Sequence, residues 1–111
     1  WKLIDKEFRY RDNNRDTFEA VRPWLRSVAD RPFLLLFHLF EPHTPYRPPA
    51  EFATRYRSPY DGEVAAADAV VGDLLDELRT LGVYDEALIV FASDHGELLG
   101  DFGSFGKRSM R

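Results

Sequence analysis

The most informative stretch of the chain covers residues 87–96 and reads Ala-Leu-Ile-Val-Phe-Ala-Ser-Asp-His-Gly. Its first six residues are all apolar, and a short run without alternation is typical of a strand buried on both faces of a parallel sheet. The polar residues Asp94 and His95 follow closely, and Gly96 allows the chain to turn sharply. We therefore predict a strand over 87–92 that ends in a polar loop.

A second apolar run lies upstream at residues 33–40, which read Phe-Leu-Leu-Leu-Phe-His-Leu-Phe. This run also predicts a buried strand, because it is short, continuous and bounded by prolines. The segment that follows, residues 41–49, contains four prolines and can continue neither a strand nor a helix. We expect a stiff loop at this position, with His43 inside it.

Helical periodicity occurs before each predicted strand. Apolar residues recur at helical intervals from Asp61 to Leu81, and Gly82 is a natural C-terminal stop. The expected solvent side of this helix carries Asp73, Asp76, Glu77 and Arg79. Upstream, Asp16 and Glu19 have capping-box spacing and predict a helix near 17–29, in which Pro23 should cause a kink or a later start. Residues 1–14 are expected to be a connecting segment.

The predicted order is helix, strand, loop, helix, strand, loop. Such alternation implies a βαβ crossover, so we expect an α/β fold with part of a mainly parallel sheet flanked by helices. Ligands bind beyond the carboxyl ends of strands in such sheets, and the loops at His43 and Asp94 should emerge at the same edge. Residues 1–111 contain no internal repeat and no sign of a second domain.

Composition excludes several classes of protein. The 111 residues are 44% hydrophobic and 14% aromatic, which favours a folded domain over a disordered chain. A net charge of −4 argues against a general nucleic-acid binder, and we expect no nucleic-acid partner. The longest apolar run, 33–40, is too short to span a bilayer. The absence of cysteine excludes a disulfide scaffold, a thiolate zinc site and a cysteine nucleophile within these residues.

Asp94, His95 and His43 are the first candidates for chemistry. A carboxylate and an imidazole from one turn can bind the same divalent cation, although Asp94 as a turn cap beside a solvent-facing His95 is the more frequent arrangement for Asp-His-Gly alone. His43 lies between two prolines, so its ring would be held at low entropic cost and could donate to an anionic oxygen. Its plain alternative is a histidine in a surface turn.

Three further residues and one short motif are weaker candidates for chemistry. Lys107 follows Gly106 and could place a cation against an oxyanion, whereas a solvated lysine is the usual outcome. His38 interrupts an apolar run and is expected to be a core histidine, or one that orients a ligand residue, rather than a ligand itself. Asp68 lies near the apolar stripe of the long helix, where a structural hydrogen bond is expected. Residues 101–103 match a kinase Asp-Phe-Gly motif, but no other kinase motif accompanies them.

Taken together, these motifs resemble the sulfatase family. The resemblance extends over residues 31–110, and the motifs that carry it are residues 32–46, 60–63, 93–101 and 105–108. It implies the α/β fold of the alkaline-phosphatase superfamily and makes the chain part of a sulfatase catalytic domain. By resemblance, Asp94 and His95 fall on a metal-binding pair. His43 falls on the histidine that contacts sulfate, and Lys107 on the lysine that bridges sulfate and nucleophile.

The resemblance also implies a reaction, the hydrolysis of a small-molecule or carbohydrate sulfate ester. A metal ion and Lys107 would neutralise the sulfuryl oxygens, and His43 would hold an oxygen or assist the leaving group. The family nucleophile is a formylglycine made from the Cys or Ser of a Cys/Ser-x-Pro-x-Arg motif. No such motif occurs in these residues, and neither do the paired aspartates that complete the metal site. We therefore expect an internal piece of a sulfatase, inactive alone, with the formylglycine before Trp1.

Several properties stay open at the level of sequence. Calcium is the expected metal by resemblance, but two ligands cannot fill its shell, and an imidazole also suits manganese or zinc, with magnesium as a further alternative. Phe102 stands where many relatives have histidine. Rival hypotheses are a phosphonate or phosphate ester hydrolase and a non-catalytic remnant that binds a partner through an exposed sheet edge. The organic part of the substrate, the oligomeric state and the cellular compartment are not determined by these residues.

Overall fold

The computed structural model describes residues 13–100, 103 and the backbone of 105–106. Its main elements are two long helices, α1 (Asn14–Val28) and α3 (Pro59–Thr80), each followed by an extended segment. The short helix α2 (Ala50–Ala53) packs against the start of α3. A single 3-10 turn, η1 (Tyr84–Glu86), follows the end of α3. The pair β1 (Leu98–Leu99) and β2 (Phe105–Gly106) forms a small antiparallel ladder.

Helix α1 begins earlier than the sequence predicted. Asn13 is the N-cap, and its side chain accepts a hydrogen bond of 2.9 Å from the main-chain N–H of Asp16. Asp16 therefore lies in the first turn and is not the cap. Pro23 lies inside a single continuous helix, so the later start is wrong, whereas the alternative of a kink at Pro23 stays a prediction.

Helix α3 confirms the prediction for residues 61–81 with small shifts at its ends. Ser58 is its N-cap and accepts from the N–H of Asp61, and Pro59 occupies the first helical position, where a missing donor does no harm. Gly82 has φ 71°, a left-handed conformation that ends the helix. Asp68 is exposed on this helix rather than packed in its apolar stripe.

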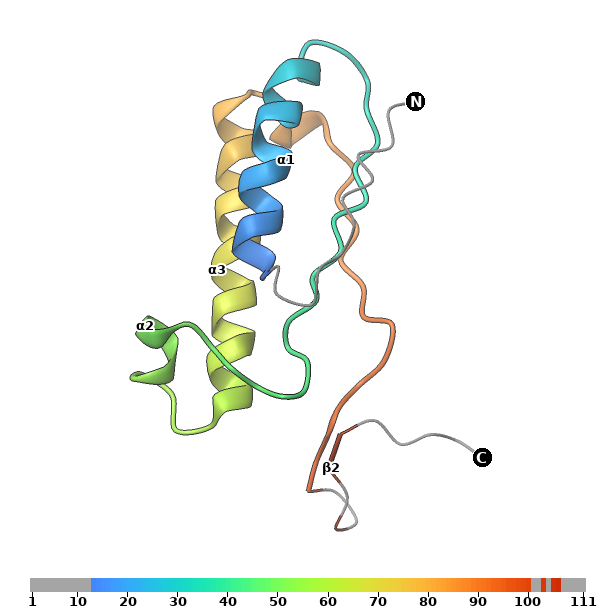
Figure 1. Ribbon diagram of the computed structural model, residues 1–111. Helices are drawn as coiled ribbons and strands as arrows, with labels where there is room; N and C mark the ends of the chain where they lie inside the picture. The colour runs from blue at the N-terminus through green and yellow to red at the C-terminus, as the bar shows by residue number, and fades with distance from the viewer. Residues whose placement is uncertain (1–12, 101–102, 104, 107–111) are drawn as a thin grey trace.

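The two long helices lie side by side and run in the same direction (Figure 1). Their shared core consists of buried apolar side chains, namely Phe18, Leu25 and Val28 of α1 and Ala66, Ala67, Val70 and Leu78 of α3. The small residues of α3 allow a close approach of the two backbones, while the large side chains of α1 fill the space between them. Leu25 is the most enclosed of these residues, with no exposed surface.

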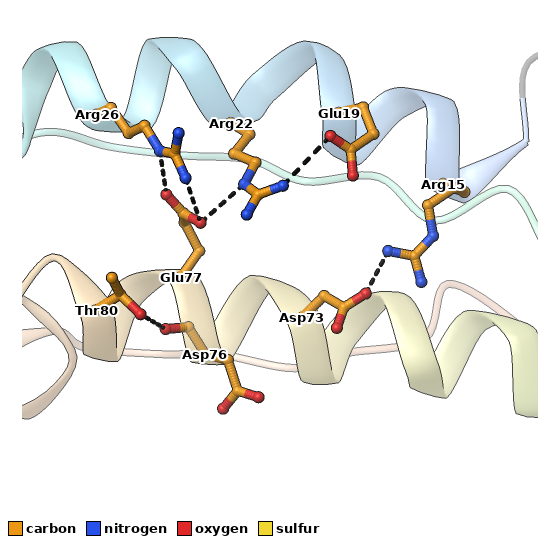
Figure 2. Close-up of polar contacts among 8 residues, drawn as sticks. All are labelled: Arg15, Glu19, Arg22, Arg26, Asp73, Asp76, Glu77 and Thr80. Atoms are coloured by element: carbon orange, nitrogen blue, oxygen red, sulfur yellow. Dashed lines mark hydrogen bonds and ion pairs between the residues drawn. The ribbon is translucent and has the colours of Figure 1, made fainter.

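Charged side chains cross between the helices along the edge of this core (Figure 2). Glu77 accepts from Arg26 at 2.6 Å and from Arg22 at 2.9 Å, and Arg15 pairs with Asp73. Hydrogen bonds from the two arginines, Arg26 first, lower the pKa of Glu77. Glu77 is only 5% exposed, so its predicted place on the solvent side is wrong: the arginines of α1 draw it into the interface.

The two predicted strands are extended but not paired. Residues 33–40 and 87–92 form no ladder with any part of the chain that the structure describes, so the predicted parallel sheet is not observed there. Both segments nevertheless run in the same direction, opposite to the helices (Figure 1). This is the polarity that a βαβ crossover requires.

The exposed fractions of the apolar side chains show that neither segment is buried on both faces. In 33–40 the side chains alternate, with Leu34 77% and Leu36 92% exposed while their neighbours are partly covered. In 87–92, Leu88 and Phe91 are 92% and 78% exposed. Extended segments become strands only when both a ladder partner and a covering layer are present. Within the described ranges, neither segment has a ladder partner, and much of each segment's apolar surface is uncovered.

No helix among the described residues combines the length and the apolar character that a membrane crossing requires.

Candidate functional site

The loop after residues 33–40 carries His43 in a well-defined position. Its imidazole stacks on the ring of Phe40, with centroids 4.5 Å apart and an interplanar angle of 21°. Its Nδ1 lies 2.6 Å from the carbonyl oxygen of Thr44. Because a carbonyl can only accept, this contact assigns the proton to Nδ1 and leaves Nε2 for another partner. The bonds Glu41–Pro42 and Thr44–Pro45 on either side of His43 are both cis.

A buried carboxylate from α3 holds the same loop. Glu63 is 3% exposed, and its Oε2 accepts from the main-chain N–H of His43 at 2.9 Å. Its Oε1 accepts from the main-chain N–H of Arg47. One residue earlier, a Cβ at Gly62 would lie 2.9 Å from Cγ of Pro48, so only glycine lets the loop pack this closely on α3.

Helix α1 contributes a second buried polar residue. The side chain of Asn14, 1% exposed, accepts from the N–H groups of Phe40 at 2.7 Å and of Glu41 at 3.3 Å. In return, Oε2 of Glu41 accepts from the main-chain N–H of Asn14 at the helix N-terminus, where a carboxylate is favoured. Burial raises the pKa of Glu41. The two helices thus hold the chain on both sides of His43.

The second candidate loop contains Asp94 and His95. Oδ2 of Asp94 lies 3.6 Å from Nε2 of His95, and Oδ1 accepts from the main-chain N–H of His95 at 3.1 Å. The Nδ1 of His95 lies 2.8 Å from the carbonyl oxygen of Gly96, which again directs the proton to Nδ1. The unprotonated Nε2 then has a lone pair that can bind a metal ion. A carboxylate oxygen and an imidazole nitrogen therefore lie close together on an exposed surface.

A hydrogen bond joins the two loops. The hydroxyl of Tyr46 donates to Oε1 of Glu97 at 2.6 Å, and the ring of Tyr46 packs edge-on against Tyr60 of α3 at 5.4 Å. Burial, followed by the bond to Glu97, raises the pKa of Tyr46 to about 12. Because Tyr46 follows His43 by three residues and Glu97 follows His95 by two, this bond brings the histidine loop and the Asp-His loop into one region.

This donor set fits part of a metal shell and not a complete one. Asp94 and His95 offer two ligands of the type that divalent cations accept. Among the residues that the structure describes, no group of three or more potential ligands is gathered. Lys107, the remaining sequence-predicted site residue, lies outside the described residues, as do Asp101 and Phe102 of the dismissed kinase motif. His38 is exposed on residues 33–40, so its predicted place in the core is wrong.

Sequence reasoning did not single out the residues that support the site, namely Asn14, Glu63, Tyr46 and Glu97. Glu63 and Glu97 stand inside motifs that carry the family resemblance, but a lone glutamate in a helix or loop normally indicates solvent contact. Their main-chain and cross-loop partners lie 16 to 51 residues away in sequence. No local pattern reveals such contacts.

The chain belongs to the sulfatase family, because the family model described as Sulfatase matches residues 4–110. It is 32% identical over 90 residues to human iduronate 2-sulfatase, covering 81% of this chain and 16% of that protein. It is 35% identical over 96 residues to human arylsulfatase A, covering 70% and 19%. A low-salt glycan biosynthesis sulfotransferase of Haloferax volcanii is 33% identical over 91 residues, covering 68% and 22%.

The chain spans about a fifth or less of the length of these relatives. No solved structure matches it significantly. Family membership implies an alkaline-phosphatase-like α/β fold. The described residues form helices and extended segments without a parallel sheet, so they do not by themselves establish that fold.

Proposed function

We propose that this chain is the part of a metal-dependent sulfatase that supplies a sulfate-binding histidine and two metal ligands. The whole protein would hydrolyse organic sulfate esters. The observation that carries the proposal is the family match over residues 4–110. The bond between Tyr46 and Glu97 supports it, because it gathers the two loops that the resemblance identifies as functional.

His43 is proposed to bind the sulfate group. With Nδ1–H donating to the carbonyl of Thr44, the imidazolium form of His43 can donate Nε2–H to an oxygen of the ester or pass that proton to the leaving group. A preorganised donor of this kind stabilises developing charge without reorganisation during the reaction. Lys107, by resemblance, would place a second positive charge on the sulfate oxygens.

Asp94 and His95 are proposed to hold a divalent cation, with Ca²⁺ as the first choice and Mg²⁺, Mn²⁺ or Zn²⁺ as alternatives. When bound, such an ion supplies positive charge that neutralises the sulfuryl oxygens. The further ligands and the nucleophile, expected as a formylglycine, would come from other parts of the protein. The 111 residues contain no cysteine and no Ser-x-Pro-x-Arg motif, so we propose that they are inactive alone.

The substrate is proposed to be a small-molecule or carbohydrate sulfate ester. One relative is named a sulfotransferase, so transfer of the sulfuryl group to a sugar hydroxyl is a second candidate. The two reactions differ only in the acceptor, which is water in one and an alcohol in the other. Product analysis in the presence of a free sugar therefore separates them.

The test uses the full-length protein that contains this chain. We expect it to hydrolyse an aryl sulfate faster than the matching phosphate or phosphonate, to lose activity in a chelator and to regain it with Ca²⁺. His43→Ala, Asp94→Asn and Lys107→Ala should each reduce kcat/KM by at least about 100-fold, the scale of one lost oxyanion contact. Asp68→Asn, an exposed carboxylate of α3, is the matched control and should retain full activity.

Three results would exclude the proposal. Faster hydrolysis of the phosphonate would move the enzyme to the related phosphonate hydrolases. Turnover that survives all three substitutions, or none by the unaltered protein, would leave a sulfatase-like protein without this activity.

A further inference from the structure

The carboxylate of Glu63 occupies an unusual place for a charged group. It is 3% exposed on the first turns of α3, and both of its oxygens accept main-chain N–H groups from the loop that carries His43. It makes no ion pair with an arginine or lysine in the described part of the chain. Burying a carboxylate is unfavourable unless its hydrogen bonds are made, so its partners explain its presence.

The two amides that Glu63 binds lie at opposite ends of the functional part of the loop. One belongs to His43 itself and the other to Arg47, four residues later. Between residues 42 and 47 only four main-chain N–H groups exist, because Pro42 and Pro45 have none. Glu63 therefore accepts from half of the amides that this segment can offer.

The upstream side of the loop is held independently. The side chain of Asn14 binds the main-chain N–H groups of Phe40 and Glu41, and the ring of Phe40 is the surface on which His43 stacks. With this end held by α1 and the other by α3, the main chain at His43 has little freedom. Losing Glu63 would release the amide of His43 while leaving the stacking surface in place.

We propose that Glu63 is a positioning residue that holds His43 for contact with the sulfate group. This inference rests on the proposed function of His43 but concerns a different residue and a different contact. Glu63 acts through the main chain of the loop and does not touch the substrate. A displacement of about 1 Å of a catalytic group can reduce the rate about 100-fold, so its effect should be visible in turnover.

Glu77 is the matched control. It is also a buried glutamate of α3, 5% exposed, but its partners are Arg22 and Arg26 of α1. Glu63→Gln and Glu77→Gln thus remove the same charge from the same helix with nearly the same shape. Only the first removes bonds to the His43 loop, because a glutamine has one acceptor oxygen where the loop needs two.

The experiment compares these two variants in the full-length protein by hydrogen exchange and by steady-state kinetics. In Glu63→Gln we expect faster amide exchange in the peptide covering residues 42–47 and a kcat reduced about 10- to 100-fold. Glu77→Gln should change neither quantity in the folded protein. In a His43→Ala background, Glu63→Gln should cause no further loss, because both substitutions act through one imidazole.

Each arm can overturn the inference separately from the proposed function. Unchanged exchange at residues 42–47 in Glu63→Gln would refute the positioning role even if the unaltered protein has no sulfatase activity. With activity present, multiplicative losses in the double variant would show that Glu63 acts independently of His43. If Glu63→Gln fails to fold, Glu63→Asp replaces it. Failure of both, with Glu77→Gln folded, would assign Glu63 to stability alone.

Discussion

Asn14→Ala is expected to destabilise the protein by about 2–4 kcal/mol. The side chain of Asn14 is 1% exposed and accepts from two main-chain N–H groups, those of Phe40 at 2.7 Å and Glu41 at 3.3 Å. Alanine leaves both donors without this acceptor. An unsatisfied buried donor costs about 1–3 kcal/mol, and the longer bond to Glu41 is placed at the lower end of that range.

The neighbouring residue offers a control in the same turn. Asn13 also uses its side chain as an acceptor, but its bond of 2.9 Å to the N–H of Asp16 is a local helix cap. Asn13→Ala should cost about 1 kcal/mol, as is usual for a lost N-cap. The two variants therefore separate a local contact from a tertiary one with the same change of residue.

Urea unfolding followed by circular dichroism measures the difference. We expect the midpoint of Asn14→Ala to fall by about two to four times as much as that of Asn13→Ala, with similar slopes for both. Amide exchange at Phe40 and Glu41 should accelerate only in Asn14→Ala. Equal midpoints for the two variants would refute the reasoning, because they would show that the loop is not anchored on α1 by this side chain.

Three further predictions concern the core, the ionised groups and the contact between loops. Leu25→Ala should lower the free energy of unfolding by about 2–5 kcal/mol, because a side chain with no exposed surface leaves a cavity, and thermal unfolding will measure this loss. The arginine bonds lower the pKa of Glu77, so its contribution to stability is present above its ordinary pKa of 4.5 and lost as pH falls through the lower folded value; Glu77→Gln should flatten the acid limb of a stability–pH curve. The pKa of Tyr46 is raised from 10 to about 12, so ionisation makes stability fall as pH rises between these values. Tyr46→Phe should remove that alkaline loss in urea titrations, and an unchanged alkaline slope would contradict the assignment.

The helices could be predicted well because their signals are local. The apolar periodicity of residues 61–81 and the left-handed Gly82 locate α3 almost to the residue. The predicted start of helix α1 is too late because both Asn13 and Asp16 are good capping residues. The choice between them depends on Asn14, whose side chain is buried against Phe40 and Glu41 and draws the start of the helix upstream.

The sheet and the support of the site could not be predicted in the same way. Residues 33–40 and 87–92 have the composition of buried strands, but a ladder needs a partner strand, and the described chain provides none for them. The pattern of helix α3 alone predicts a solvent-facing Glu77, but Arg22 and Arg26 of α1 lie opposite it and pair with its carboxylate. Charge pairing between helices overrides the pattern of a single helix.

The sequence by itself determined the two helices, the extended character of the segments between them, the family, and the candidates His43, Asp94, His95 and Lys107. These are properties of residue type and spacing along a continuous stretch of chain. Only the tertiary structure showed that Asn14 and Glu63 hold the histidine loop and that Tyr46 reaches Glu97. Such contacts depend on the packing of α1 against α3 and on main-chain donors far away in sequence. The spacing of residues within a short stretch of chain cannot predict either of these.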